Sequence, residues 1–262
     1  MRGLGEVLAD DDFGFRLILK PGKLAEFFAP RVDADLVLAE RRRWLEISPA
    51  DYAVQSERGS ESWREFAEMM ADLSLEVTRP IAAEIGKVIE PDLVFLIRDE
   101  AGIFRVTDGV VVFPTGWAFT EKIGLTLPET HGVVPGLNKA IGAAIDRFLN
   151  GLKPGAVATR SNWGLAASAE LNLHPKLMRP RLTNDVEIDR TWVRVEHQLL
   201  TAMPKTGTIL FGIRIMLHPL TEVLSDPLAR RRLLRALKTM PDDVAAYKGV
   251  SAARPKLMEI LG

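Results

Sequence analysis

The stretch that decides the fold is residues 189–220, "DRTWVRVEHQLLTAMPKTGTILFGIRIMLHPL". Its first part alternates polar and apolar side chains with the period of two that is typical of a strand with one polar face. Its second part is an apolar run in which Arg214 is the one charged residue, which indicates a more deeply buried strand. The segment between them, "TAMPKTG", carries proline and glycine, so the pattern predicts two neighbouring antiparallel strands.

Three further strands are predicted upstream of this pair. Residues 91–102, "PDLVFLIRDEAG", and 103–114, "IFRVTDGVVVFP", have the pattern of a hairpin, and residues 155–165, "GAVATRSNWGL", form another strand. A helix over residues 136–152 separates the second strand from the third. We therefore expect a single α+β domain over residues 1–262, with a five-stranded antiparallel sheet and inserted helix over 91–218. Mainly helical segments at 1–90 and 219–262 flank this sheet.

Composition excludes several classes of protein. The chain has 262 residues, a net charge of −1 and no cysteine. Without a basic surplus, no nucleic-acid or anionic-lipid partner is expected, and without cysteine there is no thiolate metal site, iron–sulfur cluster or covalently attached heme. The N-terminal sequence has acidic clusters where a signal peptide has an apolar run, and no segment has the length of a membrane span. The expected location is cytoplasmic.

The most conspicuous loop follows the predicted hairpin, at residues 111–138, "VVFPTGWAFTEKIGLTLPETHGVVPGLN". Loops of this length inside a compact domain are usually functional or disordered. This one contains His131 between two prolines, together with Trp117 and Lys122. A single neutral imidazole is a common ligand of heme iron, and a heme also needs apolar walls and a cation for its propionates. The alternative is a histidine that caps a turn.

The same blocks, in the same order, resemble one family. The loop above, then "RSNWGL", then residues 194–220, and finally "YKG" are similar to the heme-dependent oxidative N-demethylase-like family. The resemblance extends over residues 15–250 and implies a PAS-like fold whose five-stranded antiparallel sheet holds a non-covalent heme b. It also implies an oxidoreductase of the monooxygenase type. Such an enzyme oxidises an N-methyl group of a small secondary amine with dioxygen, giving a primary amine and formaldehyde.

The resemblance also implies site residues. His131 would be the axial iron ligand, with His174 and His197 as rivals; His174 otherwise has the context of an exposed loop histidine and His197 that of a core histidine. The other candidates are Trp117, Lys122, Trp163 and Arg194 around the cofactor, and Asn162, Glu196 and Arg214 in catalysis. Arg194, Glu196 and Arg214 are expected on one side of the sheet, with Glu196 as the partner of Arg214. The alternatives are core tryptophans, a turn asparagine and a solvated sheet face.

Two departures from the family pattern bear on activity. His197, Gln198 and Leu199 stand where the family has arginine, glutamine and threonine, and Ile215 and Met216 stand where it usually has threonine and tyrosine. No reductase segment accompanies these blocks, so the resemblance implies a separate electron-donor protein. The oligomeric state stays open. The alternatives to an enzyme are a non-catalytic heme-binding or sensor protein of PAS-like fold, and a cofactor-free PAS-like interaction domain.

Overall fold

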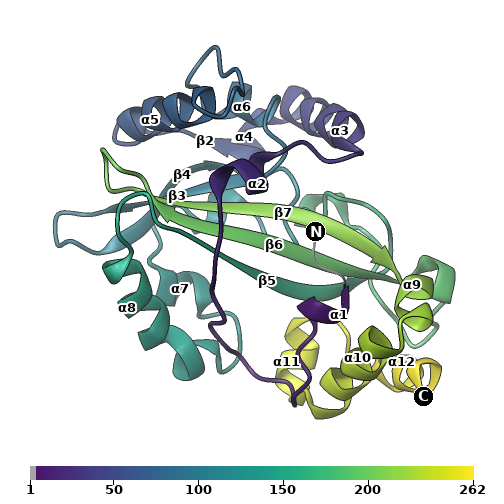
Figure 1. Cartoon of the computed structure of the whole chain (residues 1–262). Helices are drawn as coiled ribbons and strands as arrows, with labels where there is room; N and C mark the ends of the chain where they lie inside the picture. The colour runs from purple at the N-terminus through teal and green to yellow at the C-terminus, as the bar shows by residue number, and fades with distance from the viewer. Residues whose placement is uncertain (1–3) are drawn as a thin grey trace.

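The structure is a computed structural model that describes residues 4–262. Its centre is a seven-stranded antiparallel sheet in the order β1-β5-β6-β7-β3-β4-β2 (Figure 1). Five strands are long: β3 (Asp92–Arg98), β4 (Phe104–Val110), β5 (Val157–Ala166), β6 (Trp192–Ala202) and β7 (Ile209–Pro219). The two edge strands, β1 (Lys20–Pro21) and β2 (Ala53–Val54), have two residues each.

The expected mixed helix-and-sheet architecture is confirmed, but the expected five-stranded sheet is wrong in strand number. The five long strands are the ones that alternation and apolar runs predicted. The short β1 pairs with β5 through Lys20 and Thr159, and β2 pairs with β4 through Ala53 and Val110. A two-residue strand has no alternation for a sequence pattern to detect, so only tertiary pairing reveals it.

The register of the central strands sorts the candidate residues onto two faces. Glu196 lies opposite Ile215, whereas His197 lies opposite Arg214. Because neighbouring side chains of a strand point to opposite faces, Arg214 lies on the face away from Glu196. The prediction that these two share a face is therefore wrong.

One face, which we call the α5 face, carries the largest core cluster. Trp63 and Phe66 of α5 (Ser60–Ala71) pack against Phe95 of β3, with ring centroids 4.4 Å and 6.1 Å from that of Phe95. The same cluster includes residues of α2 (Leu24–Phe28), α3 (Ala34–Ile47), α4 (Pro49–Tyr52) and α6 (Ala82–Gly86). In Figure 1, α3, α5 and α6 lie above the sheet. The expected helical cover over residues 1–90 is thus present.

The C-terminal helices form a second cluster with the β5–β6 end of the sheet. It contains Val193 and Val195 of β6 and residues of α9 (Leu220–Ser225), α10 (Pro227–Thr239), α11 (Asp242–Tyr247) and α12 (Arg254–Leu261). Asp226 precedes α10, and its side chain accepts hydrogen bonds from the Leu228 and Ala229 N–H groups and so caps the helix.

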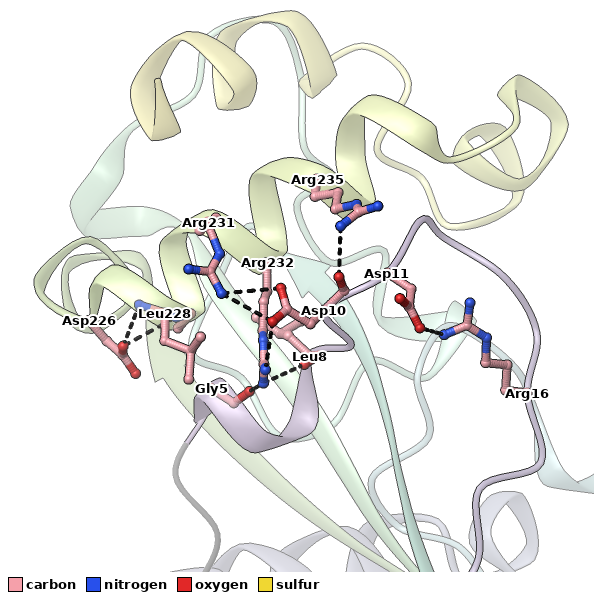
Figure 2. A network of polar contacts seen from close by, with 11 residues as sticks. Gly5, Leu8, Asp10, Asp11, Arg16, Asp226, Leu228, Arg231, Arg232 and Arg235 are labelled. Atoms are coloured by element: carbon pink, nitrogen blue, oxygen red, sulfur yellow. Dashed lines mark hydrogen bonds and ion pairs between the residues drawn. The ribbon is translucent and has the colours of Figure 1, made fainter.

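Figure 2 shows how the N-terminal segment is fastened to α10. Arg231 and Arg232 both reach the carboxylate of Asp10 at 3.1 Å, and Arg235 reaches that of Asp12 at 2.9 Å. Leu4 of the short helix α1 (Leu4–Val7) is buried in the same cluster as α10. The arginines of α10 named here therefore form ion pairs with acidic residues of the same chain.

The opposite face, which we call the α8 face, is covered by the loop that follows β4 and by α8 (Ala143–Gly151). Ile145 and Leu149 of α8 pack with Val94 and Leu96 of β3. The loop contains a 3-10 helix at Phe119–Lys122, the helix α7 (Leu127–His131) and a π-helix at Asn138–Gly142. It is thus partly helical rather than irregular. Of the helices within residues 4–262, none is long and apolar enough to span a membrane.

Candidate functional site

A polar cluster on the α8 face has Glu196 at its centre. The hydroxyl of Thr115 donates to one carboxylate oxygen of Glu196 at 2.8 Å. The amides of Gln198 and Asn162 donate to the other oxygen at 2.9 Å and 3.4 Å. Asn162 lies directly opposite Glu196 in the β5–β6 ladder. Within residues 4–262 the carboxylate is therefore held by neutral donors and forms no ion pair.

Arg194 lies on the same face, but its guanidinium mainly binds backbone carbonyl groups around it. It is 1 % exposed, and burial lowers its pKa to about 10. Its guanidinium donates to the carbonyls of Phe113 and Leu171, both at 2.8 Å, and to the Thr115 hydroxyl at 3.0 Å. Arg194 thus fixes the loop that presents Thr115 to Glu196, and its donors face protein carbonyls.

The beginning of the same loop is held by a buried ion pair. Asp92 of β3 accepts hydrogen bonds from the N–H groups of Val112 at 2.7 Å and Phe113 at 3.1 Å. Arg41 of α3 binds the same carboxylate at 2.6 Å, and the two side chains are 0 % and 1 % exposed. The helical layer is thereby connected through Asp92 to the loop on the other face.

His131 is the last residue of α7, which begins with a capping box between Thr126 and Glu129. The imidazole is half-buried, and its Nδ1 is buried with no hydrogen-bond partner among the described residues. Burial, and secondly the positive charge of Arg160, lower the pKa of His131. Both effects favour the neutral ring, which is the protonation state that a metal ligand requires.

Arg160 is a residue that the sequence interpretation missed. It lies on β5 opposite Gln198 and shares its face with Asn162. It is half-buried, and burial lowers its pKa while the charge of Glu196 opposes that change. No hydrogen bond or ion pair ties its guanidinium to another group in the described part of the chain. Its position two residues before Asn162 in "RSNWGL" was the signal that could have identified it.

The remaining candidates around the cofactor lie in two places. Trp117 and Lys122 are half-buried in the loop of the α8 face, and Trp117 packs with the cluster that contains Ile141 and Ile145. Trp163 lies opposite Val195, on the face away from Asn162, and packs with the C-terminal helices. The structure therefore does not bring Trp163 to the face that carries Glu196.

Arg214 is buried on the α5 face, and its partner is not the one expected. It lies 4.0 Å from the carboxylate of Glu90 and donates to the carbonyl of Ala29 at 3.0 Å. Its guanidinium is 5.7 Å from the ring centroid of Phe27. A buried arginine with a carboxylate neighbour was expected, but Glu196 is on the other face and cannot be that neighbour.

The two rival histidines are both in packed surroundings. His174 is 3 % exposed, so the expectation of an exposed loop histidine is wrong; its Nδ1 accepts from the Lys176 N–H at 3.2 Å. His197 is on the α5 face, 3.3 Å from the Ser161 hydroxyl and 5.7 Å from the ring centroid of Phe27. His131 is half-buried on the side of the sheet covered by the loop, whereas His174 is buried; Nε2 of His174, like Nδ1 of His131, has no hydrogen-bond partner among the described residues.

Residues 49–258 match the family described as "Haem-dependent oxidative N-demethylase, alpha subunit-like". Because this match spans most of the 262 residues, the chain belongs to that family. The resemblance drawn from the ordered sequence blocks is confirmed, and the family's description implies dependence on heme.

Proposed function

We propose that the protein is a heme b-binding oxidoreductase that removes an N-methyl group from a small secondary amine with dioxygen. The observation that carries the proposal is His131, a half-buried imidazole on the covered α8 face whose Nδ1 has no hydrogen-bond partner among residues 4–262 and whose pKa is lowered by burial. Family membership supplies the expected class of cofactor. The absence of cysteine excludes thioether attachment, so the proposed form is non-covalent heme b.

The side chains near His131 fit such a group. A heme b needs an axial ligand, apolar walls and cations for its two propionates. His131 would be the axial ligand, and Trp117 would supply part of the wall. Lys122 and Arg160 are half-buried cations without hydrogen bonds or ion pairs to residues 4–262, so both are available for carboxylates. We also propose that the five long strands form the PAS-like core in which the heme is held.

The reaction would consume one dioxygen, two electrons and two protons for each methyl group removed. The products would be the primary amine, formaldehyde and water. When bound, the heme would supply the activation of dioxygen. We propose that a separate electron-donor protein supplies the two electrons.

Glu196 would bind the substrate in this proposal. A small secondary amine is protonated at neutral pH, and a carboxylate that forms no ion pair with residues 4–262 is suited to bind an ammonium. Thr115, Gln198 and Asn162 fix the two carboxylate oxygens, so the position of the amine nitrogen would be fixed as well. The same carboxylate would accept the proton that the amine loses before its methyl group is oxidised.

The departure at residue 197 does not weaken this proposal. His197 lies opposite Arg214 and points to the α5 face, whereas Glu196 points to the α8 face. Replacing the family's arginine by histidine therefore leaves the polar cluster around Glu196 unchanged. The second departure differs in this respect, because Ile215, where the family usually has threonine, lies opposite Glu196 on the α8 face.

The proposal is tested by replacing three histidines separately: His131→Ala, His174→Ala and His197→Ala. After heme reconstitution, the His131 variant should lose the wild-type Soret position and most of its heme content, whereas the other two should keep both. Wild-type protein with a supplied reductant should consume dioxygen when dimethylamine is added. A His131 variant with the wild-type spectrum would show that the ligand is another residue. Dioxygen uptake unaffected by amine would favour the sensor function.

A further inference from the structure

Among residues 4–262, Arg160 differs from the other shielded arginines because its guanidinium forms no hydrogen bond or ion pair within this part of the chain. Arg41 pairs with Asp92 at 2.6 Å, Arg31 with Asp33 at 2.5 Å, and Arg232 with Asp10 at 3.1 Å. Arg160 is half-buried and partly desolvated, yet it forms no ion pair or hydrogen bond with the described residues. Partial removal of a guanidinium from water costs free energy unless an anion or an acceptor compensates. This cost raises the question of which group compensates the charge of Arg160.

The neighbouring charges of the chain do not provide that partner. Glu196 acts on Arg160 electrostatically, but both of its oxygens already accept hydrogen bonds from Thr115, Gln198 and Asn162. His131 is near Arg160, but an imidazole carries no negative charge that could pair with a guanidinium. Its protonated form would be repelled by Arg160. The N–H donors of Arg160 therefore remain free on the α8 face, beside the proposed axial ligand.

We propose that Arg160 binds a carboxylate of the cofactor. This inference rests on the proposed function, since the anion in question is a heme propionate. The planar guanidinium matches a carboxylate with two parallel hydrogen bonds, which a lysine cannot reproduce. A strand residue is also well suited to this role, because the paired β5–β6 ladder fixes its backbone.

A consequence is that Arg160 and His131 would act on the same cofactor from different elements. His131 ends α7, and Arg160 lies in β5, far apart in the chain. The imidazole would hold the iron and the guanidinium would hold the porphyrin edge, which together fix the orientation of the ring. Lys122 is likewise a half-buried cation whose side chain has no partner among the described residues, and it is the candidate for the second carboxylate.

The experiment compares two hemes on two proteins. Apoprotein, wild type and Arg160→Gln, is titrated with iron protoporphyrin IX and with its dimethyl ester, which lacks the propionate charges. The dissociation constant and the rate of heme transfer to a scavenging globin are measured for each combination. Arg160→Lys tests recovery of the charge alone, and Arg147→Gln, at an exposed residue of α8, is the matched control.

The expected result is a loss confined to the free acid. Arg160→Gln should weaken binding of iron protoporphyrin IX by about ten- to one-hundred-fold, the usual effect of losing a charge-assisted hydrogen bond. The Soret position of the complex should stay that of the wild type, because His131 is unchanged. The dimethyl ester should bind wild type and Arg160→Gln equally, and Arg160→Lys should recover part of the affinity for the free acid.

Three results would overturn the inference. Equal losses for the acid and the ester would mean that Arg160 supports the fold and not a carboxylate, and no loss for the acid would mean that it binds no propionate. If the ester is too weakly bound to compare, a loss of affinity for the free acid in Arg147→Gln as large as that in Arg160→Gln decides against the inference. Wild-type protein that binds neither heme would overturn the proposed function as well, which separates the two failures.

Discussion

Replacing Arg41 by methionine is the perturbation whose effect on stability can be worked out most directly from the structure. Arg41 and Asp92 are 0 % and 1 % exposed, and their charged atoms are 2.6 Å apart. The variant would leave Asp92 buried with the N–H groups of Val112 and Phe113 as its remaining partners. It would also leave the Gly86 carbonyl without the 2.8 Å bond from Arg41 Nε.

The expected cost is about 3–5 kcal/mol, the usual effect of removing one member of a buried pair. For a chain of this size that corresponds to a fall in Tm of roughly 6–20 °C. Because Asp92 holds the start of the loop that carries Thr115, heme affinity should fall together with stability. The assay is urea unfolding followed by far-UV circular dichroism, at pH 7 and without heme.

Two further variants decide whether the stated cause is correct. Arg42→Met, at the exposed neighbour of Arg41, should change the free energy of unfolding by no more than about 0.5 kcal/mol. Adding Asp92→Asn to Arg41→Met should recover part of the lost stability, since it removes the unpaired charge. A loss below about 1 kcal/mol for Arg41→Met, or no recovery in the double variant, would refute the account of a buried charge pair.

Three other predictions concern separate regions. Burial lowers the pKa of His174, so the unfolded chain binds a proton at this residue more readily than the folded chain does. The free energy of unfolding should therefore fall as the pH drops below about 6.5, and it should fall less steeply in His174→Gln. Unfolding measured at several pH values checks this. Asp10→Asn should loosen the N-terminal segment from α10, seen as faster proteolysis there with little change in global unfolding. Gly109→Ala would place a Cβ 2.4 Å from the Leu93 carbonyl oxygen and should cost about 1–3 kcal/mol in urea unfolding, whereas Gly164→Ala, with open space around it, should be near neutral.

The sequence predicted each long strand but not how the strands are placed against one another. Period-two alternation assigns Arg194 and Glu196 to one face of β6, and that assignment agrees with the register. The face of Arg214 depends on the connection between β6 and β7, residues 203–208, which has an even number of residues. With Ala202 opposite Ile209, every even-numbered residue of β6 meets an odd-numbered residue of β7. A pairing of β6 with β7 that is shifted by one residue would have placed Arg214 opposite a residue of the Glu196 face.

In the candidate site, too, the sequence indicated some side chains but not their partners or their burial. His131 stood out in the sequence because two prolines frame it within a conspicuous loop. Arg160 did not stand out, because a lone arginine in a strand is ordinary until its surroundings show that it has no partner. The burial of His174 was likewise invisible, since it comes from packing against Tyr52, with ring centroids 5.5 Å apart, in another part of the chain. Local patterns reveal elements, whereas pairing and burial follow from tertiary contacts.

The two faces of the sheet differ in whether their shielded charged side chains have ion-pair partners, and this difference supports the location of the site. On the α5 face, Arg214 has Glu90 beside it, so its charge is balanced within the chain. On the α8 face, Glu196 is held by neutral donors, and Arg160 is partly desolvated without a bonded anion in the described chain. Charges that are shielded from water and only partly compensated by neighbouring charges raise the free energy of the folded state. A bound molecule that carries both an anionic and a cationic complement would lower that free energy. A propionate-bearing heme with an ammonium substrate is such a combination, which is why the α8 face is the place to test for both.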